Sequence, residues 1–153
     1  MISKKIENGL NGIPAIPGDK SISHRSIIIP SISNGVCEVN HYLESDDVKN
    51  TINAFTSMGV KIEKQKNKII IFGKGLNSLK RPTNDIYLGN SGTGARLLTG
   101  LLSSQKFETT LIGDKSLSSR PMNRIADPLR KMNANIKTNE GKMPLLIKGN
   151  NLL

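Results

Sequence analysis

The chain has 153 residues, a length that suits one compact domain or two small repeated units and excludes a large multidomain enzyme. It carries 22 Lys and Arg residues against 12 Asp and Glu, a formal net charge of +10, so we expect its ligands to be anionic. Aromatic residues make up only 3% and Trp is absent, which argues against a protein that stacks single-stranded nucleic acid on aromatic side chains.

The first third of the chain predicts a strand, a helix, a further strand and a second helix. A short strand at 13–16 is expected to precede the segment PGDKSISHR at 17–25, which opens a helix. Cys37 lies in an alternating strand and is expected to be buried. Ser45 is the predicted N-cap of the next helix, and Gly59 its C-terminal stop. The core face of that helix carries Val48, Ile52, Phe55 and Met58.

A hairpin closes this part of the chain, and the same order of elements then returns. Alternating segments at 60–64 and 68–72 predict the first hairpin, and 86–88 predicts the strand that opens the second copy. A glycine-rich segment then starts a helix, and Ser119 is the N-cap candidate of the following one. That last helix places Met122, Ile125, Leu129 and Met132 on one face, before a hairpin formed by 134–137 and 145–148. Pro30 and Pro128 predict kinks or early ends in their helices.

Two copies of one supersecondary unit account for this order. The segment PGDKSISHR at 17–25 matches LGNSGTGAR at 88–96, which makes Arg25 and Arg96 equivalent, and a Lys-Gly pair closes each copy at 74–75 and 148–149. We therefore expect an α/β fold of repeated βαβαββ units, with a first unit at 17–82 and a second at 83–153.

Three polar clusters carry the residues that point to chemistry. In the first, Lys20 and Ser21 start a helix that also bears Arg25, a combination suited to holding an anion. The second is LGNSGTGARLL, whose glycines let a ligand approach a helix start. The third, GDKSLSSRPM, has Arg120 where the first copy has Asp46, and a cation there is unfavourable unless it serves a ligand. The alternative to anion binding is a structural role for each cluster, as a capped and solvated helix start or an exposed arginine without a ligand.

Other titratable residues show no recognisable catalytic arrangement. His24 and His41 have no neighbouring carboxylate or nucleophile in the sequence and are interpreted as packing or solvent residues. A single cysteine forms no internal disulfide, so we expect a reducing compartment. It makes no zinc site without other ligands, so we expect no metal. Without an apolar run of about 18 residues, the protein is expected to be soluble and cytoplasmic.

Together, PGDKSISHR, LGNSGTGARLL and GDKSLSSRPM resemble the enolpyruvyl transferases, and within them the branch that acts on shikimate 3-phosphate. The resemblance covers nearly the whole chain and about the first third of the family's length. It implies transfer of the enolpyruvyl group of phosphoenolpyruvate to the 5-hydroxyl of shikimate 3-phosphate, with release of phosphate, on the route to chorismate and the aromatic amino acids. It also implies an inside-out barrel with mixed four-stranded sheets and buried helices, no cofactor, and a monomeric full-length enzyme.

The resemblance assigns roles to five residues of this sequence. Lys20 is implied to be catalytic and to contact both substrates, Ser21 and Arg25 to hold shikimate 3-phosphate, and Gly92 and Arg120 to bind phosphoenolpyruvate. Residues 1–16 are implied to belong to the family's other domain, and a third unit is absent. We therefore expect an inactive fragment with weak anion affinity and an uncovered apolar surface.

The sequence leaves two alternatives. The related branch that acts on UDP-N-acetylglucosamine has Lys-Asn where this chain has Lys20 and Ser21, and a catalytic cysteine in the loop that here reads GDKSLSSRP. A basic RNA-binding or RNA-processing module of similar fold would require exposed aromatics or a C-terminal catalytic histidine. Neither pattern fits this sequence well.

Overall fold

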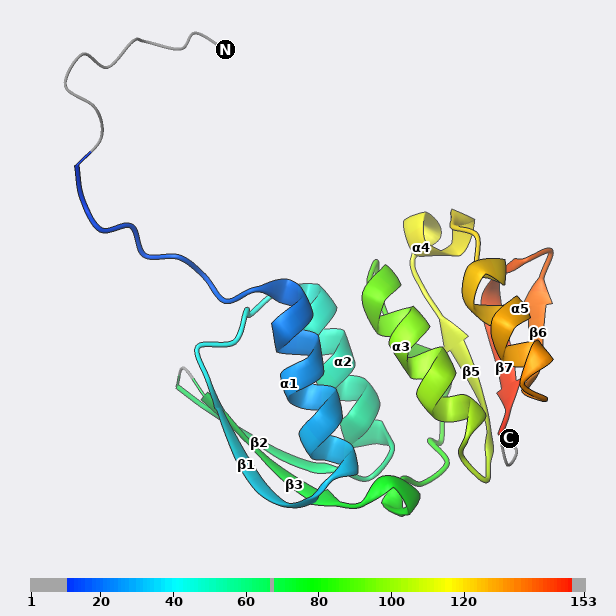
Figure 1. Ribbon diagram of the computed structural model, residues 1–153, viewed down its shortest axis with the longest axis horizontal. Coiled ribbons are helices and arrows are strands. Elements are labelled where there is room, and N and C mark those ends of the chain that lie inside the picture. Colours follow the sequence, from blue (N-terminus) through cyan, green and yellow to red (C-terminus); the bar gives the residue numbers. More distant parts are fainter. Residues whose placement is uncertain (1–10, 67, 150–153) are drawn as a thin grey trace, which may run out of the picture.

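Two sheets with helices packed against them follow each other along the chain in the computed structural model, which describes residues 11–66 and 68–149 (Figure 1). The elements in order are α1 (Lys20–Ile32), β1 (Asn34–Asn40), α2 (Asp46–Ser57), β2 (Lys61–Gln65), β3 (Lys68–Lys74), the 3-10 turn η1 (Leu76–Ser78), β4 (Ile86–Tyr87), α3 (Gly92–Ser103), β5 (Glu108–Ile112), α4 (Lys115–Ser119), α5 (Asn123–Lys131), β6 (Asn135–Asn139) and β7 (Lys142–Lys148).

The two sheets share one strand pattern. Among the described residues the first has the order β1-β3-β2 and is antiparallel, and the second has the order β4-β5-β7-β6, in which β4 and β5 are parallel. Asn34 pairs with Lys74 in the first sheet, and Glu108 pairs with Lys148 in the second, so the registers repeat as well. This mixed α/β architecture, with repeated helix and hairpin elements, confirms the predicted fold class.

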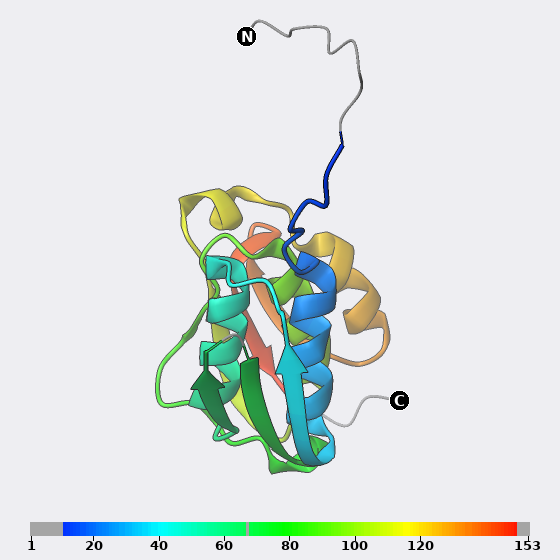
Figure 2. The same ribbon diagram turned by 90° about the vertical axis from the view of Figure 1, so that its left-hand side faces the viewer.

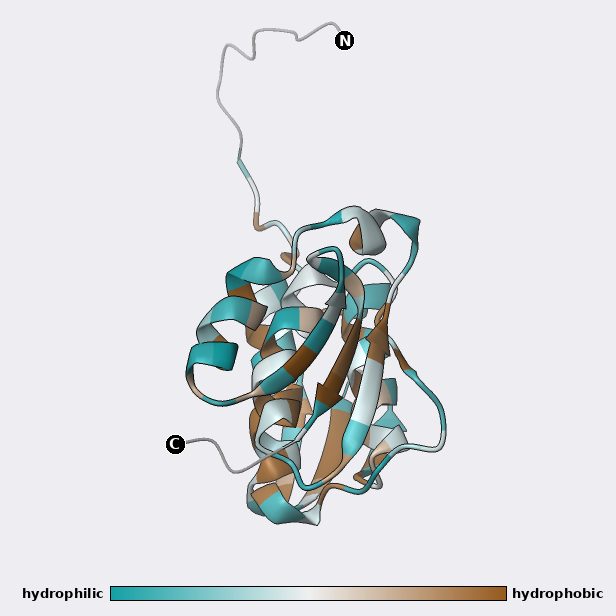
Figure 3. Cartoon of the chain, turned by 90° about the vertical axis from the view of Figure 1, so that its right-hand side faces the viewer, coloured by the Kyte–Doolittle hydropathy of each residue, from teal (hydrophilic) through white to brown (hydrophobic). Residues whose placement is uncertain are grey.

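The helices α1, α2 and α3 lie side by side between the sheets (Figures 1 and 2). The middle of β7 is hydrophobic whereas α5 is mostly hydrophilic on its outer side (Figure 3). The fully buried side chains come from both units and form one core, with Ile27, Phe55, Met58, Ile69, Ile71, Leu88, Leu98, Leu102, Leu111, Leu117, Met122 and Leu145 as its largest members. The two copies therefore share a core.

Capping residues explain where the main helices begin. The side chain of Asp19 accepts a hydrogen bond from the backbone N–H of Ile22 at 2.7 Å and starts α1. Ser45 caps α2 as predicted. Past the end of α2, Gly59 has a φ of +88°, a conformation that only glycine adopts readily.

The structure corrects four local predictions. Residues 13–16 form no strand: Ile13 is fully exposed and the segment leads away from the sheets, so the first sheet has three strands in the described part of the chain instead of four. Cys37 is half-buried rather than buried. Neither helix ends at its proline, because α1 continues to Ile32 and α5 to Lys131, whereas a kink at either proline stays a prediction.

The start of the last helix also differs from the prediction. Ser119 ends the short helix α4 rather than capping a long one, and α5 starts three residues after Arg120 behind Met122, whose side chain makes no capping bond. The sequence GDKSLSSRP forms this separate turn because Asp114 caps it, its carboxylate accepting from the backbone N–H of Leu117 at 2.7 Å. Met132 is 46% exposed and does not belong to the core.

Candidate functional site

Lys20 lies in the first turn of α1, beside the start of α2. Its ammonium group forms an ion pair with the carboxylate of Asp47 at 3.1 Å, and about half of the lysine side chain is exposed. Asp47 occupies the first turn of α2, where a carboxylate also interacts favourably with the helix dipole. The pair thus joins the N-termini of two helices of the first unit.

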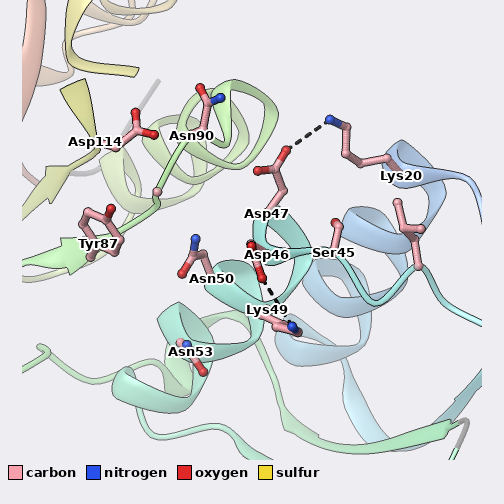
Figure 4. A pocket seen from close by; sticks show the side chains of 12 residues that line it. Lys20, Ser45, Asp46, Asp47, Lys49, Asn50, Asn53, Tyr87, Asn90 and Asp114 are labelled. Atoms are coloured by element: carbon pink, nitrogen blue, oxygen red, sulfur yellow. Dashed lines mark hydrogen bonds and ion pairs between the residues drawn. The ribbon is translucent and has the colours of Figure 1, made fainter. Parts of the chain in front are cut away.

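A cleft of about 880 Å³ separates this pair from the start of the second unit. Figure 4 shows Lys20 on one side and Asn90 on the other, with Asp47 between them. The lining residues are Lys20, Leu43, Ser45, Asp46, Asp47, Lys49, Asn50, Asn53, Tyr87, Gly89, Asn90 and Asp114. Lys20 and Lys49 are each paired with an aspartate, so the cleft floor carries little uncompensated positive charge.

Two arginines that form no ion pair within the described part of the chain, Arg96 and Arg120, lie beside the cleft, around the first turn of α3. Arg120 donates a hydrogen bond to the side-chain oxygen of Asn90, and Arg96 donates one to the backbone oxygen of Gly92 at 3.1 Å. A Cβ atom on Gly92 would lie 2.8 Å from Nη1 of Arg96 and 2.9 Å from Nη1 of Arg120. Two guanidinium groups and a helix N-terminus therefore meet at one glycine, an arrangement suited to a carboxylate or phosphate.

Backbone contacts hold the second and third motifs together. The backbone N–H of Asp114 donates to the carbonyl oxygen of Gly89 at 2.9 Å, and Arg96 also donates to the carbonyl oxygen of Pro121 at 3.3 Å. The loop that carries Arg120 is thus fixed against the start of α3.

The five predicted site residues do not all lie in one place. Gly92 and Arg120 lie together, and Asn90 links them to the cleft that Lys20 lines. Ser21 is exposed in the first turn of α1, outside the cleft lining. Arg25 is exposed on another face of α1, where it borders an apolar groove with Ile22, Ser26, Ile29, Pro30, Cys37, Glu38, Val39 and Asn40.

His24 is buried behind the site, as the packing interpretation predicts. Its Nδ1 lies 2.8 Å from Oγ1 of Thr51 and its Nε2 lies 3.5 Å from Oγ of Ser91. Burial lowers the pKa of His24, an effect that Asp47 opposes and Lys20 reinforces. His41, by contrast, is exposed and has a φ of +55°.

Sequence reasoning missed Asp47, Asn90 and Arg96 as members of the site. Asn90 and Arg96 stand inside the glycine-rich motif, and Arg96 matches Arg25 in the repeat, so a signal was present. The position of Asp47 in the first turn of α2 is sufficiently explained by the helix dipole. No sequence pattern indicates that it forms an ion pair with Lys20. Within residues 11–66 and 68–149, no three His, Cys, Asp or Glu side chains gather where they could hold a metal ion.

No helix among the described residues has both the length and the apolar character needed to cross a membrane.

Comparisons with known proteins match this arrangement to one family. A profile of the family described as EPSP synthase (3-phosphoshikimate 1-carboxyvinyltransferase) matches residues 4–153. A protein of that name from Ruthia magnifica subsp. Calyptogena magnifica is 52% identical over 97% of this chain, and one from Bacillus cytotoxicus is 46% identical over 99% of it.

A solved structure of EPSP synthase from Acinetobacter baumannii superimposes with a TM-score of 0.87 and 49% identity, over 90% of this chain and 32% of that one. The chain spans 34% of the length of the Ruthia relative, about a third. The family resemblance read from the three motifs is thereby confirmed: the chain belongs to the EPSP synthase family.

Proposed function

We propose that this chain provides the N-terminal part of the active site of a 3-phosphoshikimate 1-carboxyvinyltransferase. The complete enzyme transfers the enolpyruvyl group of phosphoenolpyruvate to the 5-hydroxyl of shikimate 3-phosphate and releases phosphate. The observation that carries the proposal is the meeting of Arg96 and Arg120 at Gly92, beside the cleft that Lys20 lines, in a chain of this family. Both substrates carry a phosphate and a carboxylate, which guanidinium groups recognise.

The rim around Gly92 is the proposed position of phosphoenolpyruvate. Arg120 would bind one of its anionic groups with a charge-assisted hydrogen bond, worth about 1.5 to 3 kcal/mol. The lack of a side chain on Gly92 leaves both guanidinium groups where they can reach that group. Asn90 would orient Arg120 through the hydrogen bond that the two residues share.

Shikimate 3-phosphate would lie over the start of α1. Ser21 and Arg25 are exposed there and would hold it, while Lys20 would contact both substrates. An anion approaching Lys20 competes with Asp47 for the ammonium group, so part of the binding energy is spent on rearranging this pair.

The 5-hydroxyl oxygen adds to C2 of phosphoenolpyruvate and loses its proton, while the C2=C3 π bond breaks and C3 takes up a proton. The tetrahedral intermediate then loses phosphate from C2 and a proton from C3, which restores the double bond. That intermediate keeps the negative charges of both substrates, so Lys20 and Arg120 would stabilise it if their positions are fixed before the reaction. The resemblance puts the proton-transferring carboxylates in the remainder of the enzyme. We therefore propose that this chain binds and orients substrate but does not turn it over alone.

The proposal is tested in a full-length chimera in which this chain replaces the matching third of the Ruthia magnifica relative. We expect phosphate release that depends on both substrates. Lys20→Ala and Arg120→Ala should lower kcat/KM by about ten- to a hundredfold, since each removes a charged contact to the transition state. Arg124→Ala removes an exposed arginine four residues further on and serves as the control. Near-normal turnover in either site variant would refute the assigned roles.

We also propose that residues 17–82 and 83–153 are two of three units of one domain, with 1–16 contributing to the other domain. This division is supported by the repeated strand registers, although residues 1–10 and 150–153 lie outside the described part of the chain. A cytoplasmic, monomeric full-length enzyme without a cofactor remains a prediction from the sequence.

A further inference from the structure

His24 joins the two repeated units at a point that the proposed reaction does not use. The imidazole ring is fully buried on α1 in the first unit, and its two nitrogens face hydroxyl groups from α2 and from the N-cap of α3. Thr51 and Ser91 are also fully buried, so none of the three side chains has solvent as a substitute partner.

The neighbouring bonds determine where the protons lie. Thr51 Oγ1 lies 3.3 Å from the backbone oxygen of Asp47 and can donate to it. When it does so, it accepts from His24 at 2.8 Å, and the ring proton is then on Nδ1. Nε2 is then an acceptor, and the hydroxyl of Ser91 donates to it. Ser91 Oγ in turn accepts from the backbone N–H of Gly94 at 3.0 Å. One neutral tautomer thus satisfies every group in the chain of bonds.

A charged ring does not fit this arrangement. With protons on both nitrogens, Ser91 Oγ would have to accept from His24 as well as from Gly94, and its own proton would lose its acceptor. Asp47 and Lys20, the charged residues that act on the ring from α2 and α1, have opposite effects and partly cancel.

Gly94 allows the two units to approach closely at this point. A Cβ atom on Gly94 would lie 2.8 Å from Ser91 Oγ and 3.2 Å from Thr51 Oγ1, one hydroxyl from each unit. The first turn of α3 is therefore packed directly against α2 and its hydroxyl, with His24 bridging the two helices.

We propose that His24 is a positioning residue of the candidate site: its bonds to Thr51 and Ser91 set the spacing between the Lys20–Asp47 pair and the start of α3. Thr51 lies one helical turn after Asp47, and Ser91 stands between Asn90 and Gly92, so both ends of the bridge adjoin site residues. The inference rests on the proposed function only in taking these residues to bind substrate.

The experiment uses this chain with isotope-labelled histidine and backbone nitrogen, and phosphoenolpyruvate as the ligand. Imidazole nitrogen shifts at neutral pH report the tautomer, with exposed His41 giving the spectrum of a solvated ring. The site variants are His24→Asn, which retains a donor near the Nδ1 position, and Thr51→Val, which removes a hydroxyl at nearly constant volume. The control is Thr99→Val, because within residues 11–66 and 68–149 that buried hydroxyl of α3 bonds only in its own helix, to the backbone oxygen of Ala95 at 2.7 Å.

We expect the Nδ1–H tautomer in the unaltered chain. Both site variants should shift the amide signals of Gly92 and Gly94 and weaken phosphoenolpyruvate binding about two- to tenfold, the effect of one lost hydrogen bond. In the double variant these effects should be smaller than the sum of the two single ones, because both changes break the same bridge. Thr99→Val should leave the two amide signals and the affinity unchanged.

A ring protonated on Nε2 or doubly protonated at neutral pH would overturn the proposal, as would an equal loss of affinity in Thr99→Val. Amide signals of Gly92 and Gly94 that stay unchanged in the site variants would do the same. If the unaltered chain shows no response to phosphoenolpyruvate, the proposed half-site fails, whereas the tautomer and the non-additive amide shifts still decide whether His24 bridges the units.

Discussion

Three glycines of α3 provide an internal comparison, because an added methyl group would meet different surroundings at each one. At Gly92 it would meet Nη1 of Arg96 and of Arg120, at 2.8 and 2.9 Å, which are the far ends of flexible side chains. At Gly94 it would meet two buried hydroxyls, and at Gly100 it would meet nothing within 4 Å. We therefore predict that Gly92→Ala impairs binding without loss of stability.

The magnitudes follow from these contacts. Gly100→Ala should raise the free energy of unfolding by about 0.4 to 1 kcal/mol, since alanine loses less conformational freedom in a helix. Gly92→Ala should leave the free energy of unfolding unchanged or raise it slightly, because the side chains of the two arginines move aside. Displacing Arg120 removes one charge-assisted hydrogen bond of about 1.5 kcal/mol, so phosphoenolpyruvate should bind about tenfold more weakly. Gly94→Ala should cost about 1 to 3 kcal/mol, because its neighbours cannot move away.

Urea unfolding and phosphoenolpyruvate titration of the three variants give both quantities, with kcat and KM from the chimera as a second measure. The reasoning is wrong if Gly92→Ala binds phosphoenolpyruvate as tightly as Gly100→Ala does. It is also wrong if Gly92→Ala loses as much stability as Gly94→Ala, because the arginines would then be rigid parts of the fold.

The remaining predictions concern pH, an exposed face and a helix cap. Because burial lowers the pKa of His24 below its ordinary value of 6.5, the unfolded chain binds a proton that the folded chain excludes. The free energy of unfolding should therefore keep its full value above about pH 6.5 and decline below it, by no more than about 1.4 kcal/mol per pH unit. Urea unfolding at several pH values measures this decline, and a decline of equal size in His24→Asn would contradict the prediction. Ile22 and Ile29 are 58% and 57% exposed on α1, so we predict that this face makes the chain self-associate in sedimentation experiments and that changing both residues to Lys reduces the association. Equal sedimentation of the two proteins would contradict this prediction. Asp19→Ala should lower the free energy of unfolding by about 1 kcal/mol and Asp19→Asn by much less, as determined by thermal unfolding; equal losses would rule out capping as the cause.

Elements with a local cause were predictable from the sequence. The hairpins followed from alternating residues around polar turns, and the turn at Glu140 and Gly141 has positive φ at both positions, as a tight hairpin requires. The cap at Ser45 and the stop at Gly59 depend on neighbouring backbone groups only. The meeting of Gly92 with Arg120 was expected from the family motifs, and the geometry around Gly92 agrees with it.

Features that depend on distant contacts were not predictable. The apolar residues at 13–16 suit a strand, but among the described residues no neighbouring strand pairs with them. Met132 fits the helical pattern of α5, yet it lies past the end of that helix, at its C-cap. The ion pair of Lys20 joins residues 27 positions apart, and the bond from His24 to Ser91 joins residues 67 apart, so neither leaves a pattern in the sequence.

The bridge at His24 bears on how duplicated segments avoid mispairing. Two copies with similar helices and similar apolar surfaces are able to stack in several registers. Hydrophobic contacts are not directional, so on their own they favour the correct register only weakly over the others. A shifted stacking would separate the buried Nε2 of His24 from the hydroxyl of Ser91, and an unpaired buried polar group costs about 1 to 3 kcal/mol. Thr51 and Ser91 would keep their bonds to Asp47 and Gly94, which lie within their own units. The polar contact between His24 and Ser91 thus favours the observed stacking of the two copies over a shifted one.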